Sequence, residues 1–120
     1  MILVDTSVWV DHLRHGDDRL ADLLNTRQVL MHPAVLGELA CGNLHNRGDL
    51  LALMQGLPKC AVATDEEVLF FIDRHSLMGR GIGYIDAQLL ASVALGAAVK
   101  LWTRDKRLQT VTASLSLLFE

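Results

Sequence analysis

The sequence has no hydrophobic run long enough to cross a membrane, and it has few of the residues that build disulfide or zinc frameworks. Its longest stretch without a charged residue, Ala87–Val99, has 13 residues, whereas a membrane-spanning helix needs about 20. The N-terminus has no basic segment ahead of an apolar one, so we expect no signal peptide. The two cysteines, Cys41 and Cys60, and the five histidines share no metal-binding spacing, and we expect His32, beside Pro33, to be structural. These absences predict a reduced, soluble, cytoplasmic domain.

Proline is also scarce, and no linker or low-complexity segment divides the chain, so we expect residues 1–120 to form one domain. Apolar residues make up 51% of the chain and charged residues 21%, which excludes intrinsic disorder. A net charge of −3 does not suit a protein that coats nucleic acid through a basic face. An acidic chain can still cleave nucleic acid where metal ions reverse the local charge.

Short apolar segments alternate with longer amphipathic ones. The expected strands are Ile2–Val4, Gln28–Met31, Cys60–Ala63 and Ala98–Thr103. The expected helices are Asp17–Thr26, Pro33 to about Gly42, Asp49–Gln55, Thr64 to about His75, Tyr84–Leu95 and Lys106–Thr112. Strands separated by helices predict an α/β fold, in which helices cover both faces of a parallel sheet.

Two aspartates follow directly after expected strands. Asp5 comes after Ile2–Val4, and Asp105 comes just after the strand that ends at Thr103. Because ligands bind beyond the carboxyl ends of parallel strands, we expect these acids to approach each other if their strands are neighbours. The alternative for each is an ordinary helix N-cap, a position that aspartate favours.

Two further acids lie on apolar helix faces. Glu38 shares its face with small and apolar residues, and Asp86 shares its face with Leu89, Leu90 and Val93. A buried carboxylate without a partner is costly, and no Lys or Arg stands at helical spacing from either acid, so a metal ion would satisfy both. The alternatives are a first-turn aspartate favoured by the helix dipole and a glutamate that reaches water.

Oxygen ligands without histidine or cysteine favour Mg²⁺ or Mn²⁺ and suit metal-assisted phosphoryl chemistry. Ser7, two residues after Asp5, is a candidate to hold a metal-bound water, with capping of the first helix as its alternative.

Four sequence blocks resemble one known family. They read MILVDTSVWVD at Met1–Asp11, HPAVLGELACG at His32–Gly42, GRGIGYIDAQLLAS at Gly79–Ser92 and LWTRDKRL at Leu101–Leu108. In this order and at these separations they resemble the PIN-domain ribonucleases, specifically the VapC toxins of bacterial toxin–antitoxin pairs. The resemblance covers nearly the whole chain.

The resemblance implies a PIN-like fold with a single parallel sheet of four to five strands, and Mg²⁺-dependent endoribonuclease activity. By position, Asp5 and Asp86 would be the primary metal ligands, and Glu38 and Asp105 would act directly or through water. Attack by water would leave a 5′-phosphate and a 3′-hydroxyl. The family also implies a homodimer and a VapB-type antitoxin that covers the groove and places a basic side chain against the acids.

The basic residues near the acids are candidates to hold the RNA backbone, with a solvated basic surface as the alternative. They are Arg80, Arg104, Lys106 and Arg107. Trp9 and Trp102 are expected in the core or at a dimer contact, with stacking on a base as the alternative.

Other functions fit parts of the pattern. A receiver-like phosphoacceptor domain has this length, but Asp5 is followed by Thr6 instead of a second acid, and no Asp ends the expected strand Cys60–Ala63. An RNA-processing PIN nuclease that is not a toxin would share the site and differ in lacking an antitoxin. A catalytically inactive binding module is disfavoured by the four intact acids.

Overall fold

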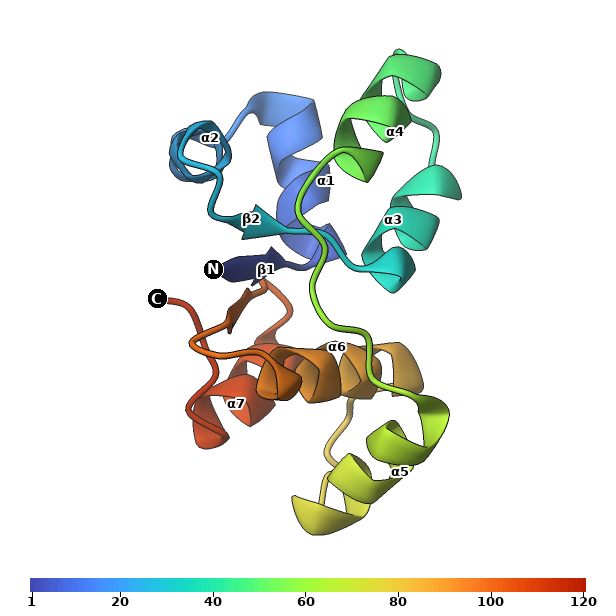
Figure 1. Cartoon of the computed structure of the whole chain (residues 1–120), viewed down its shortest axis with the longest axis vertical. Helices are drawn as coiled ribbons and strands as arrows, with labels where there is room; N and C mark the ends of the chain where they lie inside the picture. Colours follow the sequence, from blue (N-terminus) through green and yellow to red (C-terminus); the bar gives the residue numbers. More distant parts are fainter.

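The computed structural model describes residues 1–120 as three short strands and seven helices (Figure 1). Along the chain they are β1 (Ile2–Val4), α1 (Thr6–His15), α2 (Asp18–Asn25), β2 (Val29–Leu30), α3 (Pro33–Ala40), α4 (Arg47–Gln55), α5 (Asp65–Arg74), α6 (Tyr84–Leu95), β3 (Lys100–Trp102) and α7 (Lys106–Ser114). The α/β class agrees with the prediction, whereas α1 was not among the expected helices and no strand forms between α4 and α5.

The sheet is parallel, with strand order β2-β1-β3. All three residues of the central strand β1 are buried, as expected for a parallel strand with helices on both faces. Leu3 pairs with Leu30 on one side and with Leu101 on the other.

The sheet has three strands instead of the expected four to five, because the outer two positions are reduced to single parallel bridges. Lys59 bridges to Met31 beyond β2, and Leu118 bridges to Leu101 beyond β3. The prediction of a strand at Cys60–Ala63 is therefore wrong. After the bridge at Lys59 the chain leaves the sheet and hydrogen-bonds to α6 instead. There the side-chain amide of the buried Gln88 donates to the Ala63 carbonyl.

Helices lie on both sides of the sheet. In Figure 1, α1 to α4 occupy the part of the molecule above the strands, and α6 and α7 lie below them, with α5 against α6. Helix α6 is the central one, since Ala87–Val93 is buried without interruption. None of the helices has the length and apolar character needed to cross a membrane.

Local sequence signals explain where the helices begin. Thr64 and Glu67 form the expected capping box of α5, each side chain bonding the other residue's backbone N–H. His32 caps α3 through its side chain and Pro33 occupies the first turn. Helix α1 begins at Thr6 with Asp5 at its N-cap position, which places that aspartate at the junction of β1 and α1.

Candidate active site

Asp5 lies at the carboxyl end of β1 and is 7% exposed. Its Oδ2 atom accepts hydrogen bonds from the hydroxyls of Ser7 and Thr103, each at 2.8 Å. It occupies the N-cap position of α1 but does not cap that helix through its side chain. The Oδ1 atom has no donor, and the sole fully buried side-chain polar atom without a partner is Nε1 of Trp9. Oδ1 of Asp5 is therefore unpaired within the protein and not sealed from solvent.

Asp105 is exposed and caps α7, because its Oδ1 atom accepts a hydrogen bond from the backbone N–H of Leu108 at 3.0 Å. Its own backbone N–H donates to Thr103 Oγ1 at 3.1 Å, and the same hydroxyl donates to Asp5. Thr103 thus links the two aspartates that follow β1 and β3. The strand-end rule correctly predicted that these acids approach each other, and the alternative of an N-cap also holds for Asp105.

Asp86 lies in the first turn of α6 and is partly buried. Its removal from water raises the pKa of Asp86 above the ordinary value, whereas the hydrogen bond from the Gly83 N–H lowers it. The negative charges of Asp5, Asp105 and Glu38 raise this pKa further. In the structure, the charges of the other three predicted acids therefore all act on Asp86.

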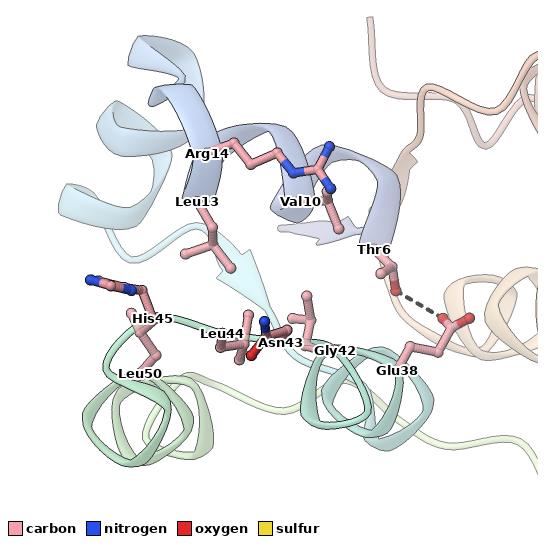
Figure 2. Close-up of a pocket in the computed structure, with 11 residues that line it drawn as sticks. Thr6, Val10, Leu13, Arg14, Glu38, Gly42, Asn43, Leu44, His45 and Leu50 are labelled. Carbon is pink, nitrogen blue, oxygen red and sulfur yellow. Dashed lines mark hydrogen bonds between the residues drawn. The ribbon is translucent and has the colours of Figure 1, made fainter.

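Glu38 is exposed, so the prediction that it lies on a buried apolar face is wrong and the alternative, a glutamate that reaches water, is correct. Its Oε1 atom accepts a hydrogen bond from the Thr6 hydroxyl at 2.8 Å, which ties α3 to the first turn of α1. Figure 2 shows this bond at one end of a hollow of about 300 Å³ that lies between α1 and the α3–α4 segment. Leu13 lines the hollow with other apolar residues, and Arg14 extends along one side.

The four acids, called the four-acid site below, are all oxygen donors. They are Asp5, Glu38, Asp86 and Asp105. No three His, Cys, Asp or Glu side chains are close enough to form a metal cage by themselves, and none of the four acids is paired with a basic side chain. Mg²⁺ does not require a full protein cage, because it keeps several waters and is bound through one or two carboxylates together with substrate phosphates. The unpaired negative charge and the donor chemistry therefore fit Mg²⁺ or Mn²⁺.

Ser7 supports Asp5 directly. Its hydroxyl donates to Asp5 Oδ2 and accepts a hydrogen bond from the backbone N–H of Arg104 at 3.0 Å. Ser7 does not cap α1, because its hydroxyl is used in this link between α1 and the segment after β3.

All four basic candidates are exposed, and three of them form no ion pair. Arg80 lies in the glycine-rich loop before α6, and Lys106 and Arg107 lie in the first turn of α7. Gly81 has φ +82°, and a Cβ atom there would lie 2.8 Å from Cδ of Arg107, so the Arg107 side chain packs on this loop. The loop and the start of α7 thus form one basic surface.

The fourth basic candidate, Arg104, is not free. Its guanidinium forms ion pairs with Asp11, at 2.7 Å, and with Asp17. Trp9 and Trp102 are 3% and 8% exposed, which places both in the core and leaves neither ring open for stacking on a base.

Sequence reasoning missed two hydroxyl side chains. Thr6 and Thr103 hydrogen-bond to Glu38 and Asp5. Their positions carry a signal, since each lies within two residues of an aspartate where a strand ends. A hydroxyl at such a position can donate a hydrogen bond to a carboxylate that would otherwise have no donor.

Known proteins resemble this chain in sequence and in fold. The family model described as PIN domain matches residues 2–113. Two curated proteins named Ribonuclease VapC32, from Mycobacterium tuberculosis strains CDC 1551 / Oshkosh and ATCC 25618 / H37Rv, are 50% identical to it over 113 residues. Each match covers 94% of this chain and 91% of the relative. A solved structure described as FitAB bound to an IR36 DNA fragment has a TM-score of 0.60 at 20% identity. It covers 94% of this chain and 91% of that chain, and it supports the fold alone.

Proposed function

The chain belongs to the PIN-domain family and, within it, to the VapC ribonucleases, and we propose that it hydrolyses RNA at the four-acid site as the toxin of a VapBC-type pair. The resemblance noted in the sequence is thereby confirmed. The observation that carries the site assignment is that Thr103 hydrogen-bonds to both Asp5 and Asp105 at the carboxyl ends of β1 and β3, and that no basic side chain pairs with these acids. In agreement, burial first, and then the charges of the other three acids, raise the pKa of Asp86.

We assign Mg²⁺, with Mn²⁺ as a substitute, to the carboxylate oxygens of this site. Asp5 and Asp86 are the primary ligands in this proposal, and Glu38 and Asp105 act directly or through water. A bound ion would lower the pKa of a water ligand and balance the charge that develops on the phosphate. Ser7 and Thr103 both donate to Oδ2 of Asp5, so they fix the carboxylate with its other oxygen directed outward.

The reaction is hydrolysis of a phosphodiester bond. The oxygen of water bonds to phosphorus, the bond from phosphorus to the 3′ oxygen breaks, and that oxygen takes a proton. The products are a 5′-phosphate and a 3′-hydroxyl. We assign the RNA backbone to the basic surface of Arg80, Lys106 and Arg107, because cations beside an acidic site attract phosphates that the acids alone would repel.

Two protein partners belong to the proposal. A cognate VapB-type antitoxin would place a basic side chain against the four-acid site, which offers unpaired carboxylates for a charge-assisted hydrogen bond. The chain would act in the cytoplasm as a homodimer. Phe70 on α5 and Leu95 on α6, which are 70% and 49% exposed, border one apolar hollow and form the surface that we assign to that contact.

The test uses the antitoxin-free protein, its Asp5→Asn variant and an Asp73→Asn control, in which the same change is made at an exposed position on α5. Each protein is incubated with total cellular RNA in Mg²⁺ and in EDTA, and the new ends are mapped. We expect discrete cuts with 5′-phosphates from the wild type and the control in Mg²⁺ alone. Cuts that persist in EDTA or in Asp5→Asn would refute the proposed mechanism.

A PIN nuclease that processes RNA without being a toxin remains the second candidate, and it would use the same acids. Membership of the PIN family removes the receiver-like reading. Expression with and without the product of an adjacent small gene separates the remaining two. A toxin arrests growth alone and is silenced by that partner, whereas a processing nuclease is not.

A further inference from the structure

Arg104 holds together three segments that surround the four-acid site. Its Nη1 atom donates to Asp11 Oδ2 on α1 at 2.7 Å, and its Nη2 atom donates to Asp17 Oδ2 at the start of α2. The guanidinium also lies over the Trp102 ring, 5.6 Å from its centroid. The contacted residues lie on α1, at the start of α2 and on β3. The Arg104 side chain therefore holds the segment after β3 against α1 and α2.

The backbone of the same residue is bonded to the site. The Arg104 N–H donates to Ser7 Oγ at 3.0 Å, and this directs the hydroxyl hydrogen of Ser7 toward Asp5 Oδ2. The residue before Arg104 is Thr103, which donates to the same oxygen, and the residue after it is Asp105. Moving this segment away from α1 would disturb both donors to Asp5 and shift Asp105.

The positive charge of Arg104 is engaged in ion pairs within the protein. The guanidinium is paired with two carboxylates, so it adds no free positive charge to the basic surface formed by Arg80, Lys106 and Arg107. Asp17 has a lowered pKa, first because of the hydrogen bond from Leu20 and next because of Arg104, which agrees with a formed ion pair. An RNA phosphate could take the bonds that Nη1 and Nη2 now make only by displacing Asp11 and Asp17.

We propose that Arg104 is a positioning residue, which orients Asp5 through Ser7 and places Asp105 by bracing the segment after β3 on Asp11 and Asp17, instead of contacting RNA. The proposal rests on the proposed ribonuclease function and replaces the expectation that Arg104 binds the RNA backbone. Partners that orient a metal ligand through hydrogen bonds commonly change metal affinity or activity about 10–100-fold when removed.

The two roles of Arg104 predict opposite effects for a change at its partner. If Arg104 braces the site, Asp11→Asn breaks the brace and lowers activity, as Arg104→Gln does. If Arg104 contacts RNA, Asp11→Asn releases the guanidinium and strengthens RNA binding. Asp22→Asn is the matched control, because it removes the same charge from an exposed position on α2 outside this network.

The experiment compares the wild type, Arg104→Gln, Asp11→Asn, the double variant and Asp22→Asn. Three quantities are measured: kcat and KM for RNA cleavage in Mg²⁺, the Kd for Mn²⁺ alone by calorimetry, and the Kd for RNA in EDTA by fluorescence anisotropy. We expect both single variants to lose about tenfold or more in Mn²⁺ affinity and to have a lower kcat. The double variant should be no worse than either single one, and RNA affinity in EDTA should stay within about twofold, because Arg104 makes no contact with RNA in this role.

Arg104→Lys should be intermediate, because a single ammonium cannot bond both carboxylates as the guanidinium does. The proposal is overturned if Arg104→Gln weakens RNA binding in EDTA while Asp11→Asn strengthens it. It is equally overturned if the Kd for Mn²⁺ is the same in the wild type and the single variants. This Mn²⁺ comparison holds even if the wild type cleaves no RNA, a result that would refute the proposed function by itself.

Discussion

Lowering the pH below neutrality should destabilise this fold through His32, whose imidazole is 2% exposed at the start of α3. Its Nδ1 atom accepts a hydrogen bond from the Ala34 N–H at 2.9 Å, so that nitrogen carries no proton. Its Nε2 atom lies 3.1 Å from the Ser92 oxygen. Since the Ser92 hydroxyl donates to Gln88, its oxygen accepts the Nε2 proton. Protonation of Nδ1 would break the cap of α3 and bury a charge, and burial accordingly lowers the pKa of His32 below its ordinary value.

The sign of the effect follows from the protons bound in each state. In the unfolded chain, His32 takes up a proton below about pH 6.5, while the buried ring stays neutral until the lower folded pKa is reached. The unfolded state then binds more protons, so the free energy of unfolding falls as pH falls. For each pH unit below 6.5 in which the folded ring stays neutral, the free energy of unfolding falls by up to about 1.4 kcal/mol.

The measurement is urea unfolding at several pH values between 7.5 and 5, compared between the wild type and His32→Asn. Asparagine can still cap α3 but does not titrate, so the variant should be less stable at pH 7.5 and lose less stability on acidification. The exposed His45 provides the control, and His45→Gln should keep the wild-type dependence. Equal pH dependence in the wild type and His32→Asn would refute the reasoning, because the buried ring would then not be the group that titrates.

Four further changes test other features. Asp86→Asn should raise the Tm at pH 7 in EDTA while abolishing cleavage, because it removes a charge that burial and the other acids disfavour; thermal unfolding and the RNA assay check this. Gly81→Ala should cost about 1–2 kcal/mol in urea unfolding, since its φ is positive and the new Cβ would displace Arg107. Gly37→Ala, with nothing near the new Cβ, should instead stabilise α3 by about 0.5–1 kcal/mol in the same assay. Thr64→Ala should lower the Tm by about 4 °C by scanning calorimetry, through loss of about 1 kcal/mol from the capping box.

The features that the sequence predicted well are those set by local chemistry. The apolar run Ile2–Val4 predicted a buried strand, and Thr64 with Glu67 predicted the start of α5. The helix Tyr84–Leu95 was predicted with its observed bounds, because most of its residues are apolar and glycines flank it. The rule that sites lie beyond strand ends predicts from the sequence alone that Asp5 and Asp105 lie close together.

The sequence could not show how side chains from distant segments pair. Glu38 was expected to be buried because its helical neighbours are apolar, but that face of α3 opens onto the hollow beside α1, and helical spacing does not show what covers a face. Arg104 was grouped with the basic residues beside it, since nothing local indicates that Asp11 and Asp17 lie across from it. Cys60–Ala63 has the composition of a strand, but the Ala63 carbonyl accepts a hydrogen bond from the Gln88 side chain instead of from a neighbouring strand.

The two single bridges at the margins of the sheet have a consequence for self-association. An uncovered outer strand offers unpaired backbone groups to which a strand of another molecule can add. Here Pro58 and Cys60 bond the backbone of Met31 on one margin, and Leu117 and Phe119 bond that of Leu101 on the other. The C-terminal segment thus covers the outer edge of β3. Removing this segment would leave the backbone groups of Leu101 free to pair with a strand of another molecule.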